Sequence, residues 1–110
     1  FPEGAKQTVQ VNRYERNPEA RAKCLEIHGI CCEICKMSFA ETYGTFAKDF
    51  IHVHHITPLH KISENYEVTP ETDLIPVCPN CHAMLHRQEN GIPMTVERLK
   101  LLYEVSKGLK

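Results

Sequence analysis

The hydrophobic pattern near the start of the chain predicts a helix. The Asn-Pro-Glu sequence at 17–19 has the order of an N-cap, a first-turn proline and a first-turn acid. Apolar side chains then recur at helical spacing, and Gly29 ends the pattern. We therefore predict a helix over 18–28, in which Cys24 acts as a small buried hydrophobe. His28 is then a last-turn residue rather than a ligand.

A second helical pattern lies near the end of the chain. Thr95 is a suitable N-cap, an acidic residue follows in the first turn, and Gly108 is a suitable stop. The apolar residues between them form one stripe, made by Val96, Leu99, Leu102 and Tyr103. We predict a helix over about 95–107 that covers the core and leaves Arg98 and Lys100 in solvent.

The middle of the chain has the period of β-strands. Over 50–57, β-branched and aromatic residues alternate with polar ones, and Pro58 limits the strand. The polar stretch 60–72 predicts a loop, and 73–77 predicts a second short strand. A weaker alternation within residues 1–16 predicts an N-terminal lead-in strand or arm. Combined with the helices, these strands predict an α+β fold.

Histidines are concentrated at two places in this pattern. Three of them occupy four consecutive positions of the first strand, where His54 and His55 point to opposite faces unless the strand twists or ends. His82 and His86 lie four residues apart on a predicted helix over 79–87, so they share one face about 6 Å apart along the axis. Two histidines so spaced can chelate one ion. Alone they would equally suit a solvent-exposed helix surface, but the histidine-rich strand favours a metal site.

The six cysteines include two C-x-x-C pairs, a spacing that lets a tight turn direct two thiolates at one ion. We predict a structural zinc site with no open position, made by Cys32, Cys35, Cys78 and Cys81. Cys31 competes with Cys32 for the first pair, but its spacing to Cys35 is one residue longer. Disulfides are the alternative, and the lack of a secretory signal pattern favours zinc in a reducing compartment.

Composition and charge narrow the possible function classes. The 110 residues are 42% hydrophobic and 25% charged, as expected for one soluble domain whose small core would benefit from a bound metal. No apolar run approaches the roughly 20 residues of a membrane span. The net charge of −1, from 13 basic and 14 acidic side chains, argues against a strongly cationic nucleic-acid binder. A nuclease stays compatible, because a divalent ion supplies positive charge at the phosphate.

Four groups of residues together resemble one known family: His54-His55-Ile56, Asp73-Leu74, Val77 to His82, and His86. They are similar to the HNH endonucleases, whose ββα-metal (His-Me finger) fold holds a divalent ion between a strand pair and a helix. Similarity to the zinc-containing, restriction-associated branch lies in the two cysteine pairs, Glu15-Arg16-Asn17-Pro18 and Tyr43-Gly44. The resemblance covers most of the chain and implies a ββα core over about 50–88, within a nuclease domain of residues 17–110.

The resemblance also implies roles for four histidines. By position, His55 is similar to the general base of the family, and His54 is similar to a metal ligand beside it. His82 matches the third residue of the HNH motif, which implies that it is both a catalytic residue and a metal ligand. His86 matches an additional helix ligand that some members carry. The implied catalytic ion is thus held by His54, His82 and His86.

The second residue of the HNH motif departs from the family pattern. Asp73 stands where the family usually has asparagine. Its carboxylate would either ligate the metal or accept a hydrogen bond that orients a histidine, which makes it a candidate catalytic residue. Asn80 is another polar candidate, although it lies inside the second cysteine pair.

These residues predict a metal-dependent DNA endonuclease with a histidine general base and one catalytic Mg²⁺, Mn²⁺, Ni²⁺ or Zn²⁺ ion. The resemblance implies that it is of restriction type. Two alternatives stay open: a non-catalytic, zinc-stabilised DNA-binding module, and a zinc hydrolase whose small substrate would need a pocket. The expected partner is double-stranded DNA, with no membrane, in the cytoplasm. A homodimer or further domains in a longer parent chain are compatible with a double-strand cut.

Overall fold

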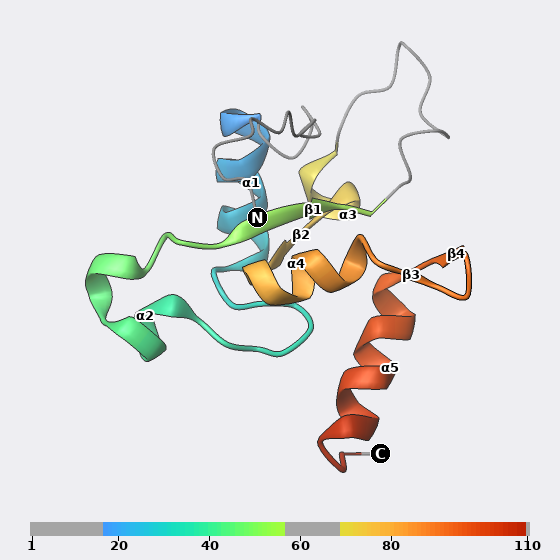
Figure 1. The fold of residues 1–110 in the computed structure, drawn as a ribbon. Coiled ribbons are helices and arrows are strands. Elements are labelled where there is room, and N and C mark those ends of the chain that lie inside the picture. The colour runs from blue at the N-terminus through green and yellow to red at the C-terminus, as the bar shows by residue number, and fades with distance from the viewer. Residues whose placement is uncertain (1–16, 57–68, 110) are drawn as a thin grey trace, which may run out of the picture.

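The computed structural model describes residues 17–56 and 69–109, so the predicted lead-in strand lies outside the described residues. Helix α1 spans Pro18–His28, as predicted (Figure 1). The Asn17 side chain accepts hydrogen bonds from the backbone N–H groups of Glu19 and Ala20, both at 3.0 Å. Gly29 ends the helix at a φ of 87°, which favours glycine. Local sequence therefore determines both ends of α1.

The centre of the molecule is an antiparallel strand pair followed by a helix. Strand β1 spans His52–His55 and pairs with β2, Leu74–Val77, in a register that sets His54 opposite Ile75. Helix α4, Pro79–Leu85, follows β2 directly and lies along the pair (Figure 1). The predicted ββα core is confirmed. Strand β1 begins two residues later than predicted, because pairing with the four-residue β2 limits its length.

A short helix, α3, lies where the sequence predicts the end of a loop. It spans Pro70–Asp73, so the predictions of a loop through residue 72 and of a strand beginning at Asp73 are wrong. The proline occupies the first turn of α3, where it is favoured. The carboxylate of Asp73 accepts a hydrogen bond from the backbone N–H of Thr69 at 2.7 Å and so satisfies the start of this helix.

Helix α1 packs against the strand pair through a small apolar cluster. Cys24, Val53 and Leu74 form this cluster and are 0%, 3% and 0% exposed. Burial raises the pKa of the Cys24 thiol to about 11, so it packs as a neutral side chain, as predicted. The guanidinium of Arg21 donates to the Ile51 carbonyl, which joins α1 to the residue before β1.

A second and larger cluster joins α4 to the C-terminal helix. Helix α5 spans Val96–Ser106 and begins with Thr95, whose hydroxyl accepts the backbone N–H of Arg98 at 3.1 Å. Val96 is buried, and Leu99 and Tyr103 pack against the same cluster, as the apolar stripe predicts. Among residues 17–56 and 69–109, no helix has the length and apolar character that crossing a bilayer requires.

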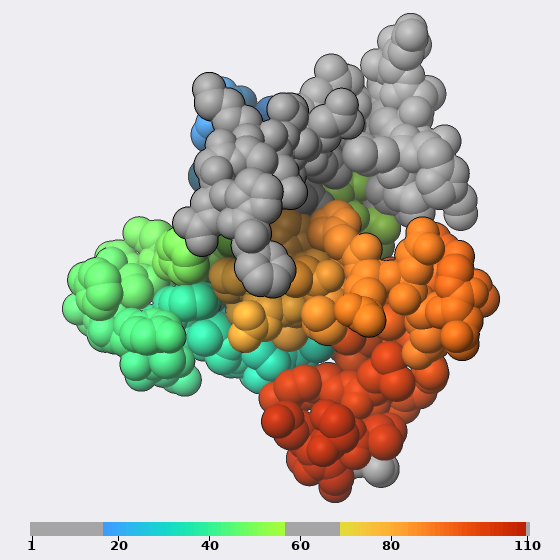
Figure 2. Space-filling view, viewed as in Figure 1, coloured from blue at the N-terminus to red at the C-terminus, as the bar shows by residue number. Residues whose placement is uncertain are grey.

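Two segments project from this body, one to the left and one to the lower right in Figure 2. One carries α2, Phe39–Tyr43, and the 3-10 turn η1, Thr45–Ala47. The other is α5. Between α4 and α5 the chain forms a small hairpin of β3, Gln88–Glu89, and β4, Ile92–Pro93. The sequence predicts only a break in this region.

Two basic residues of α5 form ion pairs that the sequence does not predict. Arg98 donates to the Glu89 carboxylate at 3.1 Å, and Lys100 donates to the Glu33 carboxylate at 3.0 Å. The prediction that Arg98 and Lys100 are only solvated is therefore wrong, because the segments they meet are distant in sequence. The second pair ties α5 to the turn between Cys32 and Cys35.

The Glu33–Lys100 pair predicts a pH-dependent contribution to stability. Partial burial opposes ionisation of Glu33, but the hydrogen bond and charge of Lys100 outweigh it and lower the pKa of this carboxyl. A lowered folded-state pKa stabilises the protein above the unfolded pKa, and the gain disappears as the pH falls through the folded value. We expect Glu33→Gln to lower the free energy of unfolding by about 0.3–1 kcal/mol at pH 7. At a pH below the folded-state pKa of Glu33, the substitution should have no effect.

Denaturant unfolding of four proteins checks this prediction: wild type, Glu33→Gln, Lys100→Gln and the double variant. The coupling energy from this cycle should shrink at low pH and in high salt. A coupling energy that is constant between pH 7 and acid would contradict the assignment.

Candidate metal centres

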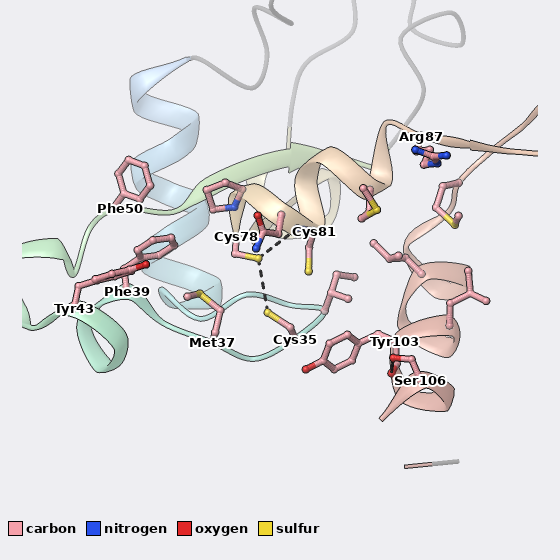
Figure 3. Close-up of a pocket in the computed structure, with 17 residues that line it drawn as sticks. Cys35, Met37, Phe39, Tyr43, Phe50, Cys78, Cys81, Arg87, Tyr103 and Ser106 are labelled. Carbon is pink, nitrogen blue, oxygen red and sulfur yellow. Dashed lines mark hydrogen bonds between the residues drawn. The ribbon is translucent and has the colours of Figure 1, made fainter. Parts of the chain in front are cut away.

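Four cysteine sulfurs converge between the first turn of α4 and the segment before α2. Figure 3 shows those of Cys35, Cys78 and Cys81. All four sulfurs lie within 4.8 Å of one another, and we call this group the four-cysteine site: Cys32, Cys35, Cys78 and Cys81. The Sγ atoms of Cys35 and Cys78 are 3.7 Å apart. Because Zn–S bonds of about 2.3 Å in a tetrahedron give sulfur–sulfur edges of about 3.8 Å, this group fits a zinc ion.

Backbone turns build each half of the four-cysteine site. In the first half, the N–H of Lys36 donates to the Cys32 carbonyl at 2.9 Å, and Lys36 has a positive φ of 68° that closes the turn. In the second half, Cys78 is the N-cap of α4, and its sulfur accepts the N–H of Cys81 at 3.4 Å. A hydrogen bond from the Glu33 N–H to the Pro76 carbonyl joins the two halves.

Burial makes the four-cysteine site a closed one. Cys32, Cys78 and Cys81 are buried, whereas Cys31 is exposed and lies outside the group. Burial raises the pKa of Cys35 to about 11, and it raises the pKa of Cys81 well above its usual range. Thiols in such a site lose their protons to solvent when they bind a cation, so metal binding releases protons.

Three imidazoles form a second group, separate from the sulfurs. Their nitrogens also lie within 4.8 Å of one another, and we call this group the three-histidine site: His54, His82 and His86. The Nε2 atoms of His82 and His86 are 3.1 Å apart. Tetrahedral Zn–N bonds of about 2.0–2.1 Å give nitrogen–nitrogen edges of about 3.4 Å, so the group is suited to one divalent ion.

Strand pairing and helix periodicity together produce the three-histidine site. The ring of His54, from β1, is 5.6 Å from the ring of His82 and 5.3 Å from that of His86. Helix α4 ends at Leu85 rather than near residue 87, and His86 is its C-cap. The N–H of His86 still donates to the His82 carbonyl at 3.2 Å, which keeps the i, i+4 geometry.

Exposure differs across the three-histidine site. His54 is 9% exposed, His82 is partly buried, and His86 is exposed. The site is therefore anchored in the interior at the strand and reachable from solvent at the end of α4. A metal held there would keep positions for further ligands, as catalytic sites require.

His55 and Asp73, two further candidates from the sequence, lie outside the three-histidine group. His55 is 4% exposed, and strand alternation puts its Cβ on the face of β1 opposite that of His54. The carboxylate of Asp73 caps α3 through Thr69, while its carbonyl accepts the Ile56 N–H at 2.8 Å. These contacts place Asp73 beside the end of β1.

A fourth imidazole, which the sequence analysis leaves without a role, lies next to the three-histidine site. Nδ1 of His52 is 2.9 Å from Nδ1 of His82, and the two rings are nearly perpendicular at 84°. The sequence does carry a signal for this contact. His52 lies two residues before His54, so both project from the same face of β1.

A cavity among the described residues is separate from the three-histidine site. It has a volume of about 930 Å³ and lies between α2, α4 and α5, where Phe39, Met84 and Tyr103 are among its lining residues (Figure 3). Its lining includes none of His54, His82 and His86. This cavity therefore gives no support to a zinc hydrolase that encloses a small substrate at the imidazoles.

Comparison with known proteins gives two matches that agree with this geometry. The sequence profile described as HNH endonuclease matches residues 32–88, just over half of the chain. The type IV methyl-directed restriction enzyme EcoKMcrA of Escherichia coli (strain K12) is 32% identical over 106 residues. That alignment covers 93% of this chain and 35% of the relative, so the chain spans about a third of the relative's length.

Proposed function

Because this chain belongs to the HNH endonuclease family, we propose that residues 17–110 form a metal-dependent nuclease domain that hydrolyses phosphodiester bonds in DNA. One observation carries the proposal: three imidazole nitrogens from β1 and α4 lie within 4.8 Å of one another at a solvent-reachable edge. A buried structural site would not need that exposed edge. The closed four-cysteine site, by contrast, suits a zinc ion that holds the fold.

The residues of the three-histidine site have distinct tasks in this proposal. His54, fixed in the strand pair, and His82, in the middle of α4, provide the rigid part of the ligand set. His86 provides the ligand nearest to the incoming phosphate, because it is the exposed member. When bound, a divalent ion supplies positive charge that stabilises the phosphate and the departing 3′ oxygen. Imidazole ligands allow Mn²⁺, Ni²⁺ or Zn²⁺, and Mg²⁺ is the remaining candidate.

We assign the general base to His55. An imidazole changes protonation near neutral pH, so it can accept a proton from the attacking water. His55 directly follows the proposed ligand His54 and is the last residue of β1, so the strand ends at the point where both side chains would have to serve one site. Asp73 is proposed to support this end of the strand through its backbone bond to Ile56, rather than to bind the ion.

The relative suggests the class of substrate. A methyl-directed restriction enzyme acts on DNA, and we propose that this domain is the cleaving part of a restriction-type protein. In this proposal, a part of the protein outside the region aligned with the relative selects the target. Cutting of both strands would require a dimer or a longer chain.

Plasmid nicking tests the proposed chemistry. We expect the zinc-loaded protein to nick supercoiled DNA when Mg²⁺, Mn²⁺, Ni²⁺ or additional Zn²⁺ is titrated in. His55→Ala should lower the nicking rate about 10²–10⁴-fold, which is the usual contribution of a general base. His55→Gln serves as a second variant, because the 4% exposure of this residue makes a smaller side chain costly to the fold.

The controls separate catalysis from folding. Both His55 variants should keep the zinc of the four-cysteine site and the circular dichroism spectrum of the wild type. Unchanged nicking by His55→Gln would remove His55 from the mechanism. Duplex binding without cleavage under all four ions would contradict the nuclease and favour a non-catalytic DNA-binding module.

A further inference from the structure

His52 touches the proposed ligand His82 at the ring nitrogen that does not face His86. The Nδ1 atom of His82 is 2.9 Å from Nδ1 of His52, while Nε2 of His82 is 3.1 Å from Nε2 of His86. The two nitrogens of one imidazole therefore point to different partners. One faces the three-histidine site, and the other faces His52.

We propose that His52 is a positioning residue that sets the orientation and tautomer of His82. This inference rests on the proposed function, because it assumes an ion at the three-histidine site. A metal-bound neutral imidazole carries its remaining proton on the other ring nitrogen. With Nε2 of His82 facing the site, Nδ1–H donates to Nδ1 of His52, whose own proton is then on Nε2.

The backbone holds His52 in the right place for this role. It is the first residue of β1, paired with Val77, and its side chain is partly buried. Its ring centre lies 5.1 Å from that of His82 at an angle of 84°, so the rings meet edge to face rather than stacked. In many metalloproteins a carboxylate or carbonyl accepts this hydrogen bond from the ligand. Here the acceptor is a third type of group, a second imidazole.

Two substitutions separate hydrogen bonding from packing. In His52→Asn, the Oδ1 atom is separated from the backbone by the same bonds as Nδ1 of histidine and accepts the same proton. In His52→Phe, a ring of similar size remains but no acceptor is left. A positioning role predicts that asparagine rescues the function and phenylalanine does not, whereas a packing role predicts the reverse.

Cobalt titration provides the readout, independent of nuclease activity. One equivalent of zinc is first loaded, which fills the four-cysteine site, and Co²⁺ binding to the three-histidine site is then followed by its visible absorption. We expect His52→Phe to weaken Co²⁺ binding about 10–100-fold and His52→Asn to stay within about threefold of wild type. Equal affinity of wild type and His52→Phe would overturn the inference.

A control variant distinguishes a wrong role for His52 from the absence of a metal site at the three histidines. His54→Ala should abolish Co²⁺ binding. If it does and His52→Phe binds normally, only the role of His52 is wrong. If the wild type binds no Co²⁺ beyond the zinc already present, both the role of His52 and the proposed function fail.

A measurement on the unmutated protein covers the case in which His52→Phe does not fold. The ¹⁵N shifts of the protein loaded with two equivalents of zinc show which imidazole nitrogens carry protons and which bind metal. We expect His82 to be protonated at Nδ1 and His52 at Nε2. Protonation or metal binding at Nδ1 of His52 would overturn the inference.

Discussion

Removal of zinc from the four-cysteine site is expected to unfold the domain. Structural zinc sites bind with apparent free energies of roughly 10–16 kcal/mol, whereas whole domains are stable by only about 5–15 kcal/mol. Three of the eight buried residues in the larger core cluster belong to the site: Cys32, Cys78 and Cys81. Circular dichroism during chelation should show loss of helix, and one equivalent of Zn²⁺ should restore it.

Adjacent cysteines provide a matched pair of variants for this experiment. Cys32→Ser removes a buried ligand and should give a protein that is unfolded at any zinc concentration. Cys31→Ser changes an exposed neighbour outside the site and should behave as wild type. An unchanged spectrum after elemental analysis has shown the zinc to be gone would contradict a structural role for the metal.

Loss of the exposed ligand should abolish cleavage while the fold persists. His86→Ala removes a solvent-exposed side chain, so we expect little change in stability. Because metal stabilisation of a phosphate transition state contributes several kcal/mol, nicking should fall at least about 10³-fold. A quantitative nicking assay over a range of each divalent ion measures this effect.

His28→Gln is the matched control for His86→Ala. His28 lies at the end of α1, and its Nε2 donates to the Glu71 carbonyl at 2.9 Å, a bond that glutamine can replace. This variant should nick as wild type does. Cleavage by His86→Ala within a few-fold of wild type would remove His86 from the ligand set.

The sequence predicts those parts of the molecule whose signals are local. Both ends of α1 agree with its prediction, because the Asn17 cap and Gly29 act within a few residues. The four-cysteine site was predictable for the same reason, since each C-x-x-C pair forms a turn by itself. The i, i+4 geometry of His82 and His86 likewise follows from helix periodicity alone.

Other features depend on contacts between distant segments and were missed or misjudged. The length of β1 follows from its pairing with β2, so its starting residue could not be read from the alternation of residues before it. The contact of His52 with His82 requires α4 to lie along β1. The partner of Lys100 is 67 positions away, in the first cysteine turn. Periodicity within one segment carries no information on such contacts.

The family resemblance and the geometry contribute different parts of the account. The resemblance alone implies His55 as the base, and nicking by its variants decides that assignment. Geometry brings His54, His82 and His86 together without reference to any family. It also adds His52, which the motif does not include.

The number of metal ions per chain tests the central claim most directly. Native mass spectrometry after loading with zinc should find two ions on the wild type, one held by the cysteines and one by the imidazoles. The double variant His54→Ala/His86→Ala should keep one. A wild type that holds a single ion, or a double variant that still holds two, would contradict the account.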